Sequence, residues 1–324
     1  MISVHAGEQL DHFQIERLVA RSGMASIFQA TDLRTGQTVA IKIPHPEMES
    51  DPVYFERFQR EEEIGRKLNH PGVMKVIPND DRHDPYIVME WVPGRLLRQV
   101  LSETHKMPPE RAIKIVVQIC KALDHIHSHG VIHRDLKPEN ILITAEGQPI
   151  IMDFGLALTK SAHRVTYSNL SATMGTPDYM APEQIEGQRG DQRTDVYALG
   201  TILFELLAGR IPFQGDSNMA VMGLHLNNTA PRLDRVNPSI SPQLAAIAAR
   251  CLARDPANRY PDMAALIEAL DHPETVDLSI LDQAQSAPTG GASVLQSQVL
   301  KAIGISALIM AVIVALALAL QALR

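Results

Sequence analysis

Two short segments of the chain carry the side chains with the clearest chemical potential, HRDLKPEN beginning at His133 and DFG beginning at Asp153. Asp135 could serve as a base, and Lys137 could neutralise a phosphate. Asn140 and Asp153 carry the oxygen ligands that Mg²⁺ prefers in proteins. Phosphoryl transfer needs this combination, because there the protein mainly positions groups and neutralises charge. The two segments together predict transfer of the γ-phosphate of ATP with the help of Mg²⁺.

The elements that must hold these segments change character at Pro93, which with Gly94 interrupts regular structure. Before it, residues 10–92 include the runs FQIERLVA and SIFQAT, which alternate apolar and polar residues as half-buried strands do. A charged amphipathic stretch predicts one helix over 51–68. After it, residues 93–271 carry apolar residues at helical spacing. We therefore predict an α+β chain with a β-rich part followed by a larger, mainly helical part.

Composition and charge limit the classes of function. The chain has 324 residues and a formal net charge of −7 at pH 7. The negative charge argues against general nucleic-acid binding, which needs a basic surface. Cys120 and Cys251 lie in apolar, helix-like runs, which favours buried thiols over a disulfide or a metal site. The N-terminal residues lack the pattern of a signal peptide.

The C-terminal part reads differently from the rest. Residues 272–300 are rich in Asp, Gln, Ser, Thr and Gly, which predicts a flexible linker. Ala302 to Leu320 contains no charged residue, and at ~1.5 Å per residue it is about as long as the hydrocarbon core of a bilayer is thick. Because it is apolar on all sides, we predict a transmembrane helix over 301–323, with an oligomerising or interfacial helix as the alternative.

This helix predicts a membrane protein that crosses the bilayer once. A domain that uses ATP belongs in the cytoplasm, so the predicted catalytic part is placed there. Small residues along the helix, such as Gly304 and Ala307, leave a homodimer open.

Four motifs relate the chain to a known family: VAIK ending at Lys42, HRDLKPEN, DFG, and GTPDYMAPE over 175–183. By these motifs residues 10–271 resemble the eukaryotic-like, or Hanks-type, serine/threonine protein kinases of bacteria. The resemblance implies the bilobal protein-kinase fold, with a small β-rich N-lobe over 10–92 that contains one helix and a larger, mainly helical C-lobe over 93–271. It also implies ATP as phosphate donor, Mg²⁺ or alternatively Mn²⁺ as the metal, serine and threonine hydroxyls of proteins as acceptors, and no nucleic-acid partner.

The resemblance also assigns chemical roles to the matching positions. Lys42 would bind the α- and β-phosphates and pair with Glu61 on the following helix. Asp135 would orient the substrate hydroxyl and accept its proton, with Lys137 against the γ-phosphate. The remaining positions that the resemblance implies are Thr176, which would help to seat the substrate, and the metal ligands Asn140 and Asp153.

For the adenine ring, the resemblance points to the strand over 86–92. The backbones of Glu90 and Val92 would meet the adenine edge, and Met89 would be the gatekeeper. The apolar residues implied to sandwich the ring are Val19, Ile27, Ala40 and Leu142. Each of these, taken alone, would be read as an ordinary core residue.

Other positions are implied to be structural or regulatory. Glu183 would form a buried ion pair with Arg259, and Asp195 would hold the backbone of the catalytic loop. Arg134 would meet a phosphate on the activation segment. The candidate autophosphorylation sites in that segment are Thr166, Ser168, Ser171 and Thr173.

The chain departs from the family pattern in two places. The expected G-x-G-x-x-G loop aligns with Ala20 to Ala25, where its three signature glycines are replaced and only Gly23 remains. Glycine there permits close approach of the backbone to phosphate, so we expect weaker ATP binding, with Ser22 and Gly23 still at the phosphates. A glycine inside a helix costs about 1 kcal/mol relative to alanine, so Gly65 predicts a loosely held helix.

Two alternatives to an active protein kinase remain at this stage. The degraded glycine-rich loop would suit a pseudokinase scaffold that binds nucleotide weakly and signals through its shape. A small-molecule kinase would share the aspartates and metal ligands, but it would lack the segment 175–183. Next to Glu61, the residues Glu62 and Glu63 are expected on a solvated face of the helix.

Overall fold

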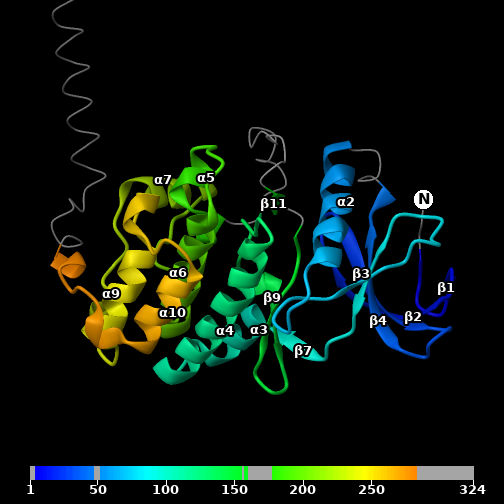
Figure 1. Ribbon diagram of the computed structural model, residues 1–324, viewed down its shortest axis with the longest axis horizontal. Coiled ribbons are helices and arrows are strands. Elements are labelled where there is room, and N and C mark those ends of the chain that lie inside the picture. The colour runs from blue at the N-terminus through cyan, green and yellow to red at the C-terminus, as the bar shows by residue number, and fades with distance from the viewer. Residues whose placement is uncertain (1–3, 47–51, 155–156, 160–176, 283–324) are drawn as a thin grey trace, which may run out of the picture. The chain divides into compact units, whose positions relative to one another are not determined.

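The computed structural model describes residues 4–46, 52–154, 157–159 and 177–282, and Figure 1 shows them as two lobes. Strands dominate the N-terminal lobe and helices dominate the C-terminal lobe. This is the α+β, bilobal arrangement predicted from the sequence.

An antiparallel sheet of six strands forms the N-lobe, in the order β1-β2-β3-β4-β6-β5. Its core contains Phe13, Ile15, Ile41 and Val88. Successive side chains of a strand point to opposite faces, so β4 buries Ile41 in this core and directs Lys42 to the other face. The strands are β1 (Gln9–Leu10), β2 (Phe13–Arg21), β3 (Ala25–Asp32), β4 (Thr38–Pro44), β5 (Val76–Ile77) and β6 (Ile87–Glu90).

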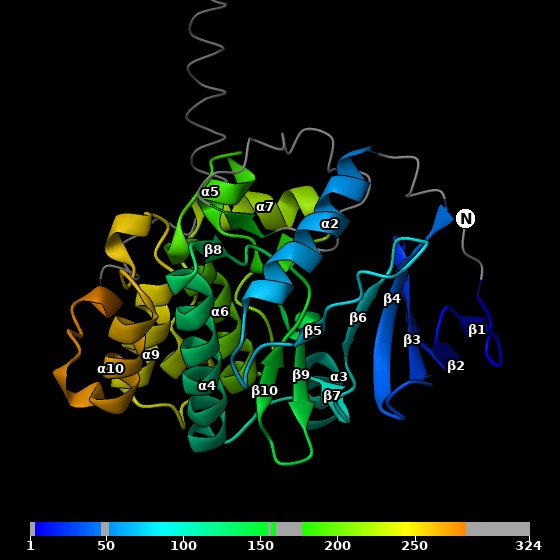
Figure 2. The same cartoon turned by 45° about the vertical axis from the view of Figure 1, so that its right-hand side comes forward.

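The N-lobe helix α2 (Pro52–Lys67) lies between the sheet and the C-lobe (Figure 2). Its Phe58 packs with Val76 of β5 and Ile87 of β6. At Gly65 a Cβ atom would lie 2.3 Å from Val76 Cγ2, much closer than real contacts allow. The glycine therefore allows α2 to approach β5 closely, whereas the sequence had suggested a loosely held helix.

The prediction that Glu62 lies on a solvated face is wrong. Its side chain is only 9% exposed, and its carboxylate accepts two hydrogen bonds of 2.7 Å from Arg82. Arg82 lies between β5 and β6 and also donates to the carbonyl of Tyr86 at 2.8 Å. The pair therefore ties α2 to the sheet. Glu63 is exposed, as predicted, and it pairs with Lys67 on the same helix.

The C-lobe is built around α6, whose residues from Thr194 to Leu207 are all buried. Helices α4 and α9 pack against α6, and α10 packs against α4. Asp191 caps the start of α6 by accepting a hydrogen bond from the amide of Arg193. The helices are α3 (Leu97–Thr104), α4 (Pro109–Ser128), α5 (Pro182–Ile185), α6 (Gln192–Ala208), α7 (Asn218–Asn227), α8 (Leu233–Val236), α9 (Pro242–Cys251) and α10 (Met263–Asp271).

Short strands of the C-lobe flank the catalytic loop. One antiparallel sheet has the order β10-β9-β7, and β8 pairs with β11 in another. The short turn of 3₁₀-helix at Pro138–Asn140 follows β8 and leads into β9. These strands are β7 (Gly94–Leu96), β8 (Val131–Ile132), β9 (Ile141–Thr144), β10 (Pro149–Ile151) and β11 (Leu158–Thr159).

The C-terminal end of the described chain continues beyond α10. Leu281 is buried against the C-lobe core, and Val276 and Ile280 pack beside it. The first part of the segment predicted as a linker therefore belongs to the C-lobe. The helix predicted over 301–323 lies outside the described residues, and within them no helix is both long and apolar enough to cross a membrane.

Replacing Gly65 by alanine should lower the free energy of unfolding by about 1–3 kcal/mol, because overpacking against Val76 outweighs the better helix propensity of alanine. In a Val76→Ala background the 2.3 Å clash with Cγ2 is removed and only the close approach to Cβ at 3.1 Å remains, so the same substitution should cost clearly less. Chemical denaturation of the four proteins measures both effects. Equal effects of Gly65→Ala in the two backgrounds would contradict the close approach.

Candidate active site

A buried ion pair joins the two main elements of the N-lobe. Lys42 of β4 donates from Nζ to both carboxylate oxygens of Glu61 on α2, at 2.6 and 2.7 Å. The two side chains are 13% and 8% exposed. Asp153 of the DFG segment lies 3.5 Å from the same Nζ, through its Oδ1 atom. The structure thus brings three of the predicted residues together from three separate parts of the chain.

The charges in this group influence one another strongly. Burial alone lowers the pKa of Lys42, but the nearby Asp153 and Glu61 carboxylates outweigh it and raise that pKa above its ordinary value. Burial, assisted by the charge of Asp153, raises the pKa of Glu61 to about 7 against the attraction of Lys42. Lys42 therefore stays positively charged, whereas the carboxylate of Glu61 takes up a proton at a higher pH than an exposed glutamate does.

The catalytic loop holds a second group of predicted residues. Lys137 Nζ contacts the two carboxylate oxygens of Asp135 at 3.0 and 2.8 Å. Asn140, which is buried, donates from Nδ2 to the carbonyl of Asp135 at 2.8 Å and to its Oδ2 atom at 3.0 Å. Asp135 itself is 30% exposed at its side chain. Its carboxylate is therefore fixed in place and still open to a substrate.

Asp195, in the first turn of α6, binds the backbone of this loop. Its fully buried carboxylate accepts hydrogen bonds from the amides of His133 and Arg134, both at 2.9 Å, and one from His127 Nε2 at 2.7 Å. Burial would raise the pKa of Asp195, but His127 and these hydrogen bonds lower it overall. This anchor fixes Arg134 in the left-handed region at φ 65°, which Asp153 also occupies at φ 65°.

The predicted pair of Glu183 and Arg259 is also present and almost fully buried. The guanidinium donates two parallel hydrogen bonds of 2.7 Å to the carboxylate, and Thr194 adds another at 2.8 Å. Bidentate geometry with extra donors is what a buried ion pair requires to offset desolvation. The pair ties α5 to α6 and to the turn before α10.

The loop that replaces the glycine-rich motif is a hairpin closed by Ser22. The Ser22 hydroxyl accepts hydrogen bonds from the amides of Met24 at 3.2 Å and Ala25 at 3.0 Å, and it donates to the carbonyl of Ala25 at 3.0 Å. A Cβ at Gly23 would meet nothing within 4 Å. The amides of Ser22, Met24 and Ala25 are thus already paired within the loop, and Gly23 is not required by the fold itself.

The residues predicted to surround adenine lie on β2, β3, β4 and β9. Ile27 is paired with Lys42 across the strands, and Ala40 is paired with Met89 of β6. The backbone amide of Glu90 donates to the carbonyl of Lys75 at 3.0 Å. The other predicted positions are Val19 of β2, which is 41% exposed, Leu142 of β9, and Val92 between β6 and β7.

The donor set of the site suits a nucleotide bound with a divalent metal. Asn140 uses its amide nitrogen on Asp135, which leaves the amide oxygen as its coordinating atom. The Met152 amide donates to the Asn140 carbonyl at 2.9 Å, which brings Asp153 next to Asn140. No group of three or more His, Cys, Asp or Glu side chains that could hold a metal exists within the described residues. A metal would therefore share its coordination with phosphates, as Mg²⁺ does.

One network beside the catalytic loop could not be predicted from the sequence. Arg98 of α3 donates to Glu139 at 2.7 Å, to Glu205 of α6 at 2.6 Å, and to the hydroxyl of Tyr179. Tyr179 in turn donates to Glu205. These partners are 41 to 107 residues from Arg98 in the chain, so no local sequence pattern predicts these contacts. The network joins the catalytic loop to the end of the activation segment.

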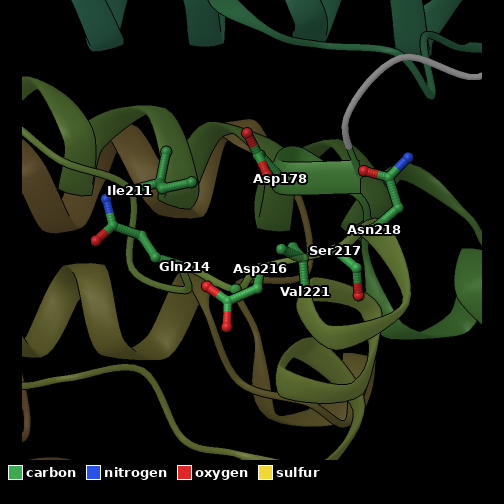
Figure 3. Close-up of a pocket in the computed structure, with 8 residues that line it drawn as sticks. Asp178, Ile211, Gln214, Asp216, Ser217, Asn218 and Val221 are labelled. Carbon is green, nitrogen blue, oxygen red and sulfur yellow. The ribbon is translucent and has the colours of Figure 1, made fainter.

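A hollow of about 400 Å³ lies next to this network, between the turn Pro177–Tyr179 and the start of α7 (Figure 3). Asp178 and Asp216 give its wall a negative charge. Burial raises the pKa of Asp178, and the charge of Glu205 adds to the effect. The hollow shares no lining residue with the site around Lys42.

Several predicted residues lie outside the described part of the chain. They are Thr176 and the candidate phosphorylation sites Thr166, Ser168, Ser171 and Thr173.

The fold and this arrangement of residues define a class of protein. Residues 13–273 match the family model for the protein kinase domain, and the chain belongs to this family. The solved kinase domain of PknI from Mycobacterium tuberculosis has the same fold, with a TM-score of 0.67 and 25% sequence identity over 84% of this chain and 100% of that one.

Named relatives are more similar in sequence. The probable serine/threonine-protein kinase SCO3848 of Streptomyces coelicolor is 37% identical over 76% of this chain and 38% of its own length. Serine/threonine-protein kinase PknB of Mycolicibacterium smegmatis is 36% identical over 77% of this chain and 41% of its own length. The chain thus spans about two fifths of the curated relatives that it matches.

Replacing Ser22 by glycine should lower the KM for ATP by about 5-fold, because the amides of Met24 and Ala25 then become available to phosphate. Steady-state kinetics with varied ATP measures the change. Ser26→Ala is the matched control, since the Ser26 hydroxyl lies on the same hairpin but contacts His45 instead. A KM that rises in Ser22→Gly would show that the hydroxyl helps the nucleotide rather than competing with it.

Lowering the pH from about 8 to about 6 should reduce kcat/KM for ATP, because Glu61, whose pKa burial raises to about 7, takes up a proton and releases its hold on Lys42. The direction of the change follows from the protonation of Glu61. Above its raised pKa the carboxylate is ionised and the pair with Lys42 is intact, and below that pKa the pair is lost. Glu61→Gln should be weakly active with a flatter profile over this range. If kcat/KM falls in the same way with pH in the wild type and in Glu61→Gln, a group other than Glu61 causes the fall.

Proposed function

We propose that the chain is a serine/threonine protein kinase that transfers the γ-phosphate of ATP, with Mg²⁺, to hydroxyl groups of protein substrates. The observation that carries the proposal is the convergence of Lys42, Glu61 and Asp153 at one place and of Asp135, Lys137 and Asn140 beside it. The named relatives are serine/threonine protein kinases by their descriptions, which supports the same substrate class here.

The residues have separate tasks in this reaction. Lys42, oriented by Glu61, holds the α- and β-phosphates, and Lys137 moves from Asp135 to the γ-phosphate. Asn140 and Asp153 would hold Mg²⁺, which neutralises phosphate charge. Asp135 orients the substrate hydroxyl and takes its proton as the hydroxyl oxygen bonds to the γ-phosphorus. The bond from that phosphorus to the β–γ bridging oxygen breaks at the same time, and ADP leaves.

Radiolabel transfer from γ-labelled ATP tests this function directly. The full chain with Mg²⁺ should label serine or threonine in itself or in an added protein, whereas Asp135→Asn should lose at least about 100-fold in rate. Asp135→Asn should keep nucleotide affinity, because it removes a proton acceptor and not a phosphate contact. Nucleotide binding without any label transfer by the wild type would instead establish a pseudokinase scaffold.

We also propose that the chain is tethered to a membrane by a helix over 301–323, with the kinase domain in the cytoplasm. The support is the uncharged, uniformly apolar sequence of this segment. We further propose autophosphorylation at Thr166, Ser168, Ser171 or Thr173, and a homodimer formed through the helix. Membrane fractionation of the full chain and of a chain lacking 299–324 tests it, since retention of the shortened chain at the membrane would exclude the tether.

A further inference from the structure

The hairpin over Ala20 to Ala25, here called the phosphate loop, accepts hydrogen bonds at its tip from two residues outside the loop. The carbonyl of Met24 accepts a hydrogen bond from the amide of His45 at 2.9 Å and another from the hydroxyl of Tyr54 at 3.1 Å. His45 follows β4 directly, so its contact is an extension of the sheet. Tyr54 belongs to α2, which is a separate element that also carries Glu61.

The position of Tyr54 connects the loop to the ion pair. Its ring packs against the cluster of Phe58, Val76 and Ile87, which anchors the base of the side chain. Burial and the charge of Glu61 raise the pKa of Tyr54 to about 12, although Lys42 opposes the shift. The hydroxyl therefore stays protonated at physiological pH and can donate its hydrogen bond to the Met24 carbonyl.

We propose that Tyr54 is a positioning residue for the nucleotide, which fixes the phosphate loop to α2 and so replaces the close fit that the missing glycines would give. The inference rests on the proposed function, because the loop is taken to cover the phosphates of ATP. It follows that the loop and the Lys42–Glu61 pair move together. When α2 is in place to orient Lys42, Tyr54 also holds the loop over the same phosphates.

A positioning role and a purely structural role of the Tyr54 hydroxyl predict different effects when the hydroxyl is removed. A hydroxyl that only stabilised the lobe would alter the unfolding temperature and leave nucleotide binding untouched. A hydroxyl that positions the loop should alter the affinity and the dissociation rate of the nucleotide, with little effect on kcat once ATP is saturating.

The test compares Tyr54→Phe with Tyr86→Phe in the full chain. Both substitutions remove one tyrosine hydroxyl from the N-lobe and keep the ring. Tyr86 donates to Asp11 at 2.6 Å and accepts from Asn79 at 2.7 Å, away from the phosphate loop. The measurements are titration with a fluorescent ADP analogue and Mg²⁺, its dissociation rate, the KM and kcat for ATP, and the thermal unfolding midpoint.

Tyr54→Phe should weaken nucleotide binding by about 5-fold, as the net value of one hydrogen bond implies, and raise the KM for ATP with kcat nearly unchanged. Tyr86→Phe should lower the unfolding midpoint and leave nucleotide affinity as in the wild type. Wild-type affinity in Tyr54→Phe, or an equal loss in Tyr86→Phe, would overturn the inference. A wild type that binds nucleotide but transfers no phosphate would defeat only the proposed function, and one that binds no nucleotide would defeat both.

Discussion

The buried ion pair between Lys42 and Glu61 is the constraint that decides where α2 must lie in the N-lobe. A charge removed from water needs a partner in good geometry, so the pair forms only when α2 lies close to β4. Three unrelated features of α2 provide this closeness: the missing side chain of Gly65, the clamp of Glu62 on Arg82, and the Tyr54 hydroxyl on the phosphate loop. The helix is therefore fixed at several points along its length.

The C-lobe follows the same physical rule with different partners. The carboxylate of Asp195 and the pair of Glu183 with Arg259 are charges buried inside a helical core, and each is satisfied by several donors. Such groups contribute little net stability compared with apolar packing, but they tolerate few alternative arrangements. Asp195 thereby holds the catalytic loop on α6, and the pair of Glu183 with Arg259 holds α5 on the same helix through Thr194.

How much of this could be predicted from the sequence depends on the distance between partners. Asp135, Lys137 and Asn140 lie within one motif, so their proximity followed from the chain itself. The carboxylate of Glu62 looked like part of a solvated run, because Arg82 lies 20 residues away on a loop without regular pattern. Arg98 had no signal at all, since its partners come from three other elements. Gly65 was interpreted through helix propensity and through the side chain that the family resemblance expects there, but the neighbouring strand decides its role, and that contact is a tertiary feature.

Arg134 and Asp153 share a consequence that comes from their backbone alone. Both adopt the left-handed conformation, which costs a residue with a side chain about 1–2 kcal/mol. Glycine, or to a lesser degree asparagine, would relieve that cost, yet neither would supply the guanidinium of Arg134 or the carboxylate of Asp153. At both positions the proposed role of the side chain therefore opposes the backbone preference for glycine.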